Sequence, residues 1–372
     1  MRIHLVTDQF SIGGGIEHIF QICRGMPQFQ FTVFGQPGPA TEKFDDLPNV
    51  RISEKGYLPQ QVMLDAPDLV HIHHLKPLLS FFKSPFNNSH TYKVPVLFTA
   101  HGLHIHKYEF YNTLSARCKY FLRFQLEKKV LPKADRVIAV SREDAAFMEN
   151  KYGLKNVDYI TNGIDFDRVK QSAGSRGEDK QQLRSRLDLP LDAFLFITVA
   201  RFNFQKGYDF LIRSLASIKE KFSSKPSCRF IFVGDGPEMT AMQSLSNQLG
   251  VTHLIQFLGA RTDVYDILRA GDVFLLPSRW EGLPISLLET GLLKLPVIAS
   301  DTYGNREIIG KENGILFKNL DKEELTQTIL EVLAGKHPLE TYAKNLYNEV
   351  HDNYSLQRMI SGLRLLYGTI PD

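Results

Sequence analysis

The chain has 372 residues, a net charge of +3 at neutral pH, 43% hydrophobic residues and 23% charged residues. These proportions are ordinary for a globular protein, and the length suggests two domains. The small net charge gives no indication of nucleic-acid binding, and no apolar run approaches the ~18 residues that a membrane-spanning helix needs. Asp8 interrupts the first apolar segment too early for a signal peptide, and the three cysteines show no paired spacing. We therefore expect a cytoplasmic protein with free thiols.

Strand-like segments alternate with helix-like segments along most of the chain. The candidate strands lie at 2–7, 31–34, 69–73, 96–99, 136–140, 157–160, 194–199, 229–233, 255–257, 273–276 and 297–299. This alternation predicts an α/β fold with two doubly wound, Rossmann-like domains, each built on a parallel sheet. We expect the domains to span 1–165 and 166–354 and to face a cleft, because open sheets of this kind bind ligands at the carboxyl ends of their strands.

A run of glycines follows the first candidate strand. Gly14 and Gly15 belong to the segment GGGIE at 13–17, where the chain must turn into a helix. Glycines at a helix start let backbone N–H groups approach an anion, so a phosphate is a natural ligand there. A tight turn without a ligand fits the same residues, because the segment matches neither a dinucleotide fingerprint nor a Walker loop.

Histidines cluster at two strand ends of the first half. His71, His73 and His74 lie in LVHIHHL, and His101 lies two residues after the strand at 96–99. His71 and His73 share one strand face, so a metal site must be considered, but no carboxylate or cysteine spacing completes it. We expect no metal, and we expect His101, His73 and His74 to line the cleft.

A basic segment with aromatic residues lies at 112–133. Its arginines, lysines and aromatic side chains fit a helix that rests on an anionic membrane surface. An ordinary helix with one core face and one solvated face fits the same pattern.

Charged and glycine-rich loops recur in the second half. Arg201 and Lys206 follow the strand at 194–199 and would repel each other unless an anion such as a diphosphate lies between them, although surface charge is an alternative. Gly234 and Asp235 follow the next strand, where Asp235 is expected to brace the loop. Arg261 follows a third strand and could stack on a nucleobase.

Glu281 and Glu289 frame the segment EGLPISLLE, which follows the apolar run VFLLP. Reading this segment as one helix predicts two carboxylates on one face, about 12 Å apart. That separation suits the two ends of an extended ligand such as a nucleotide-sugar. Two solvated glutamates on an amphipathic helix fit the pattern as well.

Taken in order, these motifs resemble those of the retaining glycosyltransferases of the GT-B fold in glycosyltransferase family 4. The resemblance covers nearly the whole chain and rests on GGGIE, HG at His101, ADRVIAVS, TNGID, ARFNFQKG, VGDGPE, FLGARTDV, PSRWEGLPISLLE and ENGILF. The two glutamates match the E-x7-E motif of that family.

The resemblance implies a role for each motif. The domain at 1–165 would bind the acceptor, the domain at 166–354 would bind the nucleotide-sugar, and a helix at 355–372 would pack back on the first domain. The implied catalytic residues are His101, Arg201, Lys206 and Glu281. The implied donor-binding residues are Gly14, Gly15, Gly234, Asp235, Arg261, Gly282, Leu283 and Glu289. The implied acceptor-side residues are His73, His74, Tyr303 and Glu307.

One loop departs from the family pattern. Many relatives carry Gly-Gly-x-x-Glu after the strand at 297–299, whereas this chain has Tyr303 and Gly304 followed by Glu307. The departure puts an acceptor inferred by analogy in doubt.

The implied activity is metal-independent transfer of a hexosyl unit, with retention, from a UDP-sugar in preference to a GDP-sugar. The acceptor would be a hydroxyl of a saccharide or lipid-linked saccharide in cell-surface polysaccharide synthesis, without a cofactor and with peripheral contact at the inner face of the membrane as an option. A nucleotide-sugar epimerase of the same fold and a non-catalytic nucleotide-sugar sensor are the alternatives. A dinucleotide-dependent oxidoreductase is disfavoured, because no G-x-G-x-x-G opens either half.

Overall fold

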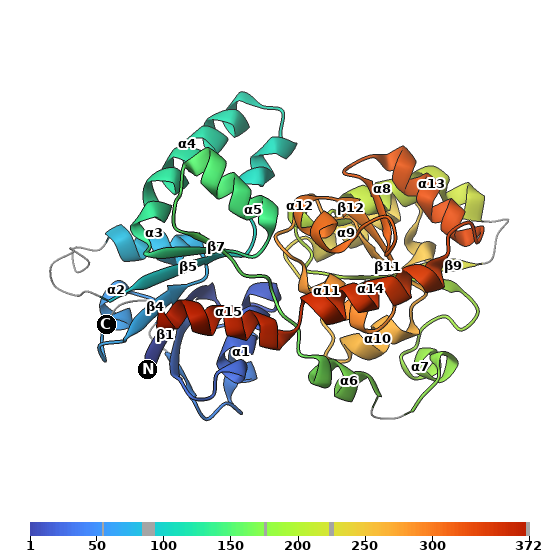
Figure 1. Ribbon diagram of the computed structural model, residues 1–372. Helices are drawn as coiled ribbons and strands as arrows, with labels where there is room; N and C mark the ends of the chain where they lie inside the picture. Colours follow the sequence, from blue (N-terminus) through green and yellow to red (C-terminus); the bar gives the residue numbers. More distant parts are fainter. Residues whose placement is uncertain (54–55, 84–93, 175–176, 223–226, 370–372) are drawn as a thin grey trace. The chain divides into compact units, whose positions relative to one another are not determined.

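A computed structural model describes residues 1–53, 56–83, 94–174, 177–222 and 227–369. The chain forms two compact units, which are described separately (Figure 1). Unit 1 comprises Met1–Gly163 and Leu356–Asp372, and unit 2 comprises Ile164–Ser355. The chain enters unit 2 at Ile164 and leaves it at Ser355, and these two residues form a parallel bridge.

Unit 1 is built on a parallel sheet of seven strands in the order β3-β2-β1-β4-β5-β6-β7. The strands are β1 (Arg2–Gln9), β2 (Gln30–Gln36), β3 (Val50–Ser53), β4 (Leu69–Ile72), β5 (Val96–Ala100), β6 (Arg136–Ala139) and β7 (Val157–Tyr159). Alternate side chains enter two cores: Ile3 and Leu5 of β1 pack on one face, and Val6 packs on the other. Because both faces are covered, the central strands β4 and β5 are buried along their whole length.

Helices cover both faces of this sheet (Figure 1). They are α1 (Gly14–Gly25), η1 (Thr41–Phe44), α2 (Pro59–Val62), α3 (Leu75–Lys83), η3 (His104–Phe110), α4 (Leu114–Val130), η4 (Leu131–Lys133), α5 (Arg142–Phe147), η5 (Met148–Tyr152) and α15 (Leu356–Gly368). The last helix of the chain packs beside α1: a Cβ added at Gly25 would lie 2.6 Å from Ile360. On α15, Leu356, Ile360, Leu363 and Tyr367 are buried in the same core as α1.

Unit 2 repeats the plan with a parallel sheet of six strands in the order β10-β9-β8-β11-β12-β13. The strands are β8 (Phe194–Val199), β9 (Cys228–Val233), β10 (Ile255–Gly259), β11 (Val273–Leu276), β12 (Val297–Asp301) and β13 (Ile315–Lys318). The helices are α6 (Phe166–Gly174), α7 (Lys180–Arg186), η6 (Phe204–Lys206), α8 (Tyr208–Ile218), η7 (Lys219–Phe222), α9 (Met239–Gln248), η8 (Thr252–Leu254), α10 (Val264–Ala270), α11 (Ile285–Leu292), α12 (Tyr303–Ile308), α13 (Lys322–Leu333) and α14 (Leu339–Asn353).

The predicted fold class is confirmed: both units are doubly wound α/β structures. In unit 1 the strand order reverses between β1 and β4, and in unit 2 it reverses between β8 and β11. The carboxyl ends of strands at such a reversal are the usual ligand site of this architecture. Within the described residues, no helix is both long and apolar enough to cross a bilayer.

Candidate active site

Glu281 is the centre of a buried polar cluster in unit 2. It follows β11, and only 5% of its side chain is exposed. Nζ of Lys206 lies 2.5 Å from Oε1 of Glu281, and Oγ of Ser278 donates to the same oxygen at 2.6 Å. Nε2 of Gln205 lies 3.4 Å from Oε2. The carboxylate is therefore held in one orientation by three side chains from two loops at the reversal between β8 and β11.

The prediction that Glu281 and Glu289 share one helix is wrong. Helix α11 begins at Ile285, and its N-cap is Pro284, whose backbone is extended with ψ 118°. Proline disfavours helical geometry in the residue before it, so the helix cannot reach back to Glu281. Glu289 is half-buried on α11, where its Oε1 accepts a hydrogen bond from the hydroxyl of Tyr265 at 3.1 Å. Gly282 and Leu283 belong to the loop that joins the two glutamates.

The two cations predicted near β8 have different surroundings. Arg201 is exposed two residues after the end of β8. Lys206 is the last residue of η6, and its charge is compensated by Glu281, with 17% of the lysine side chain exposed. The prediction that Arg201 and Lys206 would repel each other without an anion is therefore wrong, because Glu281 neutralises the charge of Lys206. The pairing of Lys206 with Glu281 was missed, because nothing in the sequence links residues 75 positions apart.

Arg279 is a further residue that the sequence analysis missed. Its guanidinium makes two hydrogen bonds to Asp209, at 2.8 and 2.7 Å, and lies 3.9 Å above the ring of Phe204. Burial raises the pKa of Asp209, but the hydrogen bond and charge of Arg279 outweigh burial and leave that pKa below its ordinary value. This partly buried pair fastens the loop that carries Glu281 to the first turn of α8.

The glycine loop after β9 packs against the loop after β8. A Cβ at Gly234, whose φ is 134°, would lie 2.2 Å from the carbonyl oxygen of Ala200. Asp235 is exposed, its Oδ1 accepts a hydrogen bond from the Gly236 amide at 2.7 Å, and its carbonyl accepts one from the Phe202 amide at 3.0 Å. These contacts brace the two loops against each other.

Arg261 is paired with a neighbouring carboxylate. Its guanidinium donates two hydrogen bonds to Asp263, at 2.8 and 2.6 Å. The hydrogen bond from Arg261 lowers the pKa of Asp263, despite its partial burial. Stacking of Arg261 on a nucleobase stays a prediction, and it would require this planar pair to turn one face toward the base.

The loop after β12 leads into α12, where Tyr303, Gly304 and Glu307 lie. Gly304 touches the Glu281 loop: a Cβ there would lie 2.0 Å from the carbonyl oxygen of Gly282. Tyr303 is 39% exposed, and Arg306 lies over its ring at 5.6 Å. Of the two positions at which many relatives carry glycine, position 304 keeps its glycine and contacts the Glu281 loop. The other position carries the exposed Tyr303.

In unit 1 the glycine loop and the histidines meet at the reversal between β1 and β4. Helix α1 begins at Gly14, and a Cβ at Gly15 would lie 3.4 Å from the His74 ring and 3.9 Å from the His101 ring. Nδ1 of His73 lies 3.2 Å from Nε2 of His101, and Thr7 Oγ1 lies 3.0 Å from Nδ1 of His74. His18 of α1, which the sequence analysis missed, lies 4.8 Å from His101 between ring centres.

Burial keeps these histidines uncharged. Burial lowers the pKa of His18 to about 4, and burial together with the smaller effect of the His18 charge lowers the pKa of His71 to about 3. The pKa values of His73 and His101 also fall well below the ordinary value, first through burial and then through the other histidines. A neutral imidazole at His101 can donate or accept a hydrogen bond, but it is a poor source of positive charge at neutral pH.

The histidines also raise the question of a metal. His71 is engaged at both ring nitrogens, by the Tyr367 hydroxyl at 2.8 Å and the Thr99 hydroxyl at 2.7 Å, which removes it as a ligand. Nitrogens of His18, His73 and His101 lie within 4.8 Å of one another. Tetrahedral zinc with Zn–N distances of ~2.05 Å would hold such nitrogens about 3.4 Å apart. The rings would have to move inward to bind zinc, so we assign no metal to them.

Comparisons with known proteins define the class. Residues 12–168 match the sequence model of Glycosyltransferase Family 4, and residues 179–349 match that of Glycosyl transferases group 1. Together the two models cover nearly the whole chain, and the chain belongs to this family of glycosyltransferases.

Individual relatives support the same class. The chain is 28% identical to TuaC of Bacillus subtilis strain 168, a glycosyltransferase assigned to teichuronic acid biosynthesis, over 82% of this chain and 71% of that protein. It is 27% identical to the UDP-Gal:alpha-D-GlcNAc-diphosphoundecaprenol alpha-1,3-galactosyltransferase of Escherichia coli, over 71% of this chain and 67% of that protein. The fold matches that of Anabaena Alr3699/HepE in complex with UDP-glucose, with a TM-score of 0.82, 20% identity and full coverage of both chains.

Proposed function

We propose that this protein transfers a hexosyl unit from a UDP-sugar to a hydroxyl group of a saccharide or lipid-linked saccharide, with retention at C1, in cell-surface polysaccharide synthesis. The observation that carries the proposal is the pair of the buried Glu281 and the partly buried Lys206, with Nζ and Oε1 2.5 Å apart, at the strand reversal of unit 2. A similar structure that holds UDP-glucose and relatives that act on a lipid-linked saccharide or serve teichuronic acid synthesis support the choice of donor, acceptor and pathway.

The chemistry follows from the charge of the leaving group. When the bond between C1 and the phosphate oxygen breaks, negative charge grows on the diphosphate, and cations already in place lower the barrier. In the proposal the positive charges of Lys206 and Arg201 stabilise this negative charge, and backbone N–H groups at Gly14 and Gly15 donate hydrogen bonds to the phosphates. Glu281 fixes Lys206 and accepts hydrogen bonds from the hexose hydroxyls, while Glu289 accepts them from the ribose.

Retention requires the acceptor oxygen to bond to C1 on the face from which the diphosphate leaves. The departing phosphate oxygen takes the proton of the acceptor hydroxyl, so no side chain has to act as a strong base. His101, kept neutral by burial, orients the sugar through a hydrogen bond. Preorganised cations make a bound metal unnecessary, and turnover should persist when EDTA is added.

The test is turnover of UDP-glucose by two variants. Lys206→Met and Glu281→Gln should each lower turnover at least ~100-fold, because each removes one preorganised charge contact. The matched control is Lys180→Ala, which breaks a pair of the same length, 2.5 Å, with Asp272 elsewhere in unit 2. All variants are assayed well below their melting temperatures. Near-normal turnover by either site variant, or strict dependence on a divalent ion, contradicts the assignment.

The same assay separates the other activities. Incubated with UDP-glucose and no acceptor, a transferase slowly releases UDP and glucose by hydrolysis. An epimerase would convert the sugar and release no UDP, and a sensor would bind the nucleotide without turnover.

We further propose that α4 makes peripheral contact with an anionic membrane surface. Leu114, Phe121 and Leu122 are 79%, 60% and 67% exposed among basic residues of this helix. Transfer of apolar side chains from water into the membrane interface is favourable by ~25 cal/mol for each Å² of apolar surface. The lysines and arginines add electrostatic attraction to anionic lipids. Sedimentation with vesicles containing phosphatidylglycerol should show binding that weakens at high salt and in Phe121→Ser. Equal sedimentation of wild type and Phe121→Ser would argue against the contact.

A further inference from the structure

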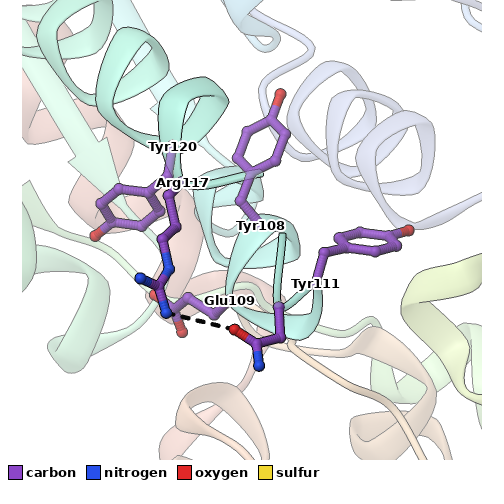
Figure 2. Close-up of a pocket in the computed structure, with 6 residues that line it drawn as sticks. Tyr108, Glu109, Tyr111, Arg117 and Tyr120 are labelled. Carbon is purple, nitrogen blue, oxygen red and sulfur yellow. Dashed lines mark hydrogen bonds between the residues drawn. The ribbon is translucent and has the colours of Figure 1, made fainter. Parts of the chain in front are cut away.

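A pocket of about 350 Å³ in unit 1 lies outside the residues to which a catalytic or donor-binding role is assigned above. Its lining is contributed by η3, the loop after it and α4, and consists of Tyr108, Glu109, Tyr111, Asn112, Arg117 and Tyr120. Figure 2 shows Tyr108 and Tyr111 on one part of the rim, and Arg117 and Tyr120 of α4 on another. The pocket lies at the low end of the 300–1,000 Å³ range of small-molecule sites.

The position of the pocket in the fold relates it to His101. That residue directly follows β5, and η3 begins only three residues later, at His104. The pocket is therefore built from the segment that leaves the same strand end as His101.

The aromatic residues of the pocket offer flat apolar surface. Tyr111 is 46% exposed, so part of its ring is open to a ligand. Lys107 covers one face of the Tyr108 ring, with Nζ 4.8 Å from the ring centre, so the aromatic surface here is bordered by charge. A ligand with both an apolar face and many hydroxyl groups would match these walls.

The polar residues of the pocket are planar groups with unused hydrogen-bonding capacity. Oε1 of Glu109 is bonded to Nδ1 of His106 at 2.8 Å, and no hydrogen bond to its Oε2 is found within the described residues. Arg117 makes a long hydrogen bond of 3.4 Å to Asn112 and, within the described residues, no ion pair. A carboxylate, an amide and a guanidinium each bind two neighbouring hydroxyl groups through a pair of parallel hydrogen bonds.

We propose that this pocket binds a pyranose unit of the acceptor saccharide, with a tyrosine ring against one sugar face and Glu109, Asn112 and Arg117 on its hydroxyl groups. The inference rests on the proposed function, and it adds the place and the chemistry of acceptor recognition. The exposed side chains of Leu114, Phe121 and Leu122, which form the apolar part of the proposed membrane contact, do not line the pocket.

Saturation-transfer NMR tests the proposal with four methyl glycosides as probes, those of glucose, galactose, N-acetylglucosamine and glucuronic acid. At least one glycoside should receive saturation from the full-length protein at millimolar concentration. Tyr111→Ala and Arg117→Ala should each weaken its binding at least ~5-fold, while Tyr111→Phe, which keeps the ring, should retain it. Tyr159→Ala, at a partly exposed tyrosine of unit 1 outside the pocket, is the matched control.

The outcomes separate this inference from the proposed function, because binding of UDP is measured on the same samples. Glycoside binding that is lost in the pocket variants, with UDP binding intact, supports the pocket. If no glycoside binds, or if binding survives in both Tyr111→Ala and Arg117→Ala, the pocket proposal is overturned even when UDP binds. Absence of UDP binding by the wild type would overturn the proposed function, and with it the acceptor role of the pocket.

Discussion

At the scale of single residues, His73 is placed to orient His101. Nδ1 of His73 and Nε2 of His101 lie 3.2 Å apart, and both rings are uncharged, so one ring donates an N–H and the other accepts it. Behind His73, the ring of His71 lies at 4.2 Å between centres and is fixed by Tyr367 and Thr99. Tyr367 belongs to α15, so the last helix of the chain fixes His71, whose ring packs against His73.

We therefore predict that His73→Ala lowers kcat about 10-fold and changes the KM for the donor little, because a misplaced catalytic group costs rate before binding. His73→Asn should recover most of the loss, since its amide can replace the ring nitrogen. Steady-state kinetics of both variants with UDP-glucose measures this. If asparagine recovers nothing while both variants melt like the wild type, His73 does not act by orienting His101.

At the scale of elements, the contact between α12 and the Glu281 loop decides the shape of the donor site. A Cβ at Gly304 would overlap the carbonyl of Gly282 at 2.0 Å, and backbone atoms cannot give way as a flexible side chain does. Gly304→Ala should shift the loop and lower turnover at least ~10-fold. Gly310→Ala is the matched control, because the nearest atom to its Cβ would be Asn313 Oδ1 at 4.0 Å. Equal turnover of the two variants would show that the loop tolerates the shift.

The same elements show what a sequence can reveal. Buried strands such as β8 and β11 were predicted to the residue, because apolar runs bounded by polar loops have few other interpretations. The edge strands β3 and β13 were missed, since Arg51 interrupts the apolar pattern of β3 and the apolar run of β13 is only three residues long, at 315–317. The start of α11 was misjudged although Pro284 marks it. The pairs Lys206–Glu281 and Arg279–Asp209 could not be predicted, because they depend on which loops the folded sheet brings together.

At the scale of the whole molecule, burying uncharged histidines makes stability depend on pH. The pKa values of His18 and His71 fall from 6.5 to about 4 and about 3 on folding. Below pH 6.5 the unfolded chain therefore binds protons that the folded chain does not, and unfolding becomes more favourable. The stability that these two residues contribute is complete above pH ~7 and is lost as the pH falls through 6.5 toward their folded pKa values.

The expected size of this effect is measurable. At pH 5 each of the two histidines lowers the free energy of unfolding by about 2 kcal/mol relative to pH 7.5. Thermal unfolding followed by circular dichroism should show a melting temperature that falls between pH 7.5 and pH 5. His18→Gln should fall less steeply, because glutamine does not titrate, and His253→Gln, at an exposed position of η8, should follow the wild type. If His18→Gln loses as much stability as the wild type over this range, the buried rings are not the cause, and the neutral state assigned to His101 beside His18 loses its support.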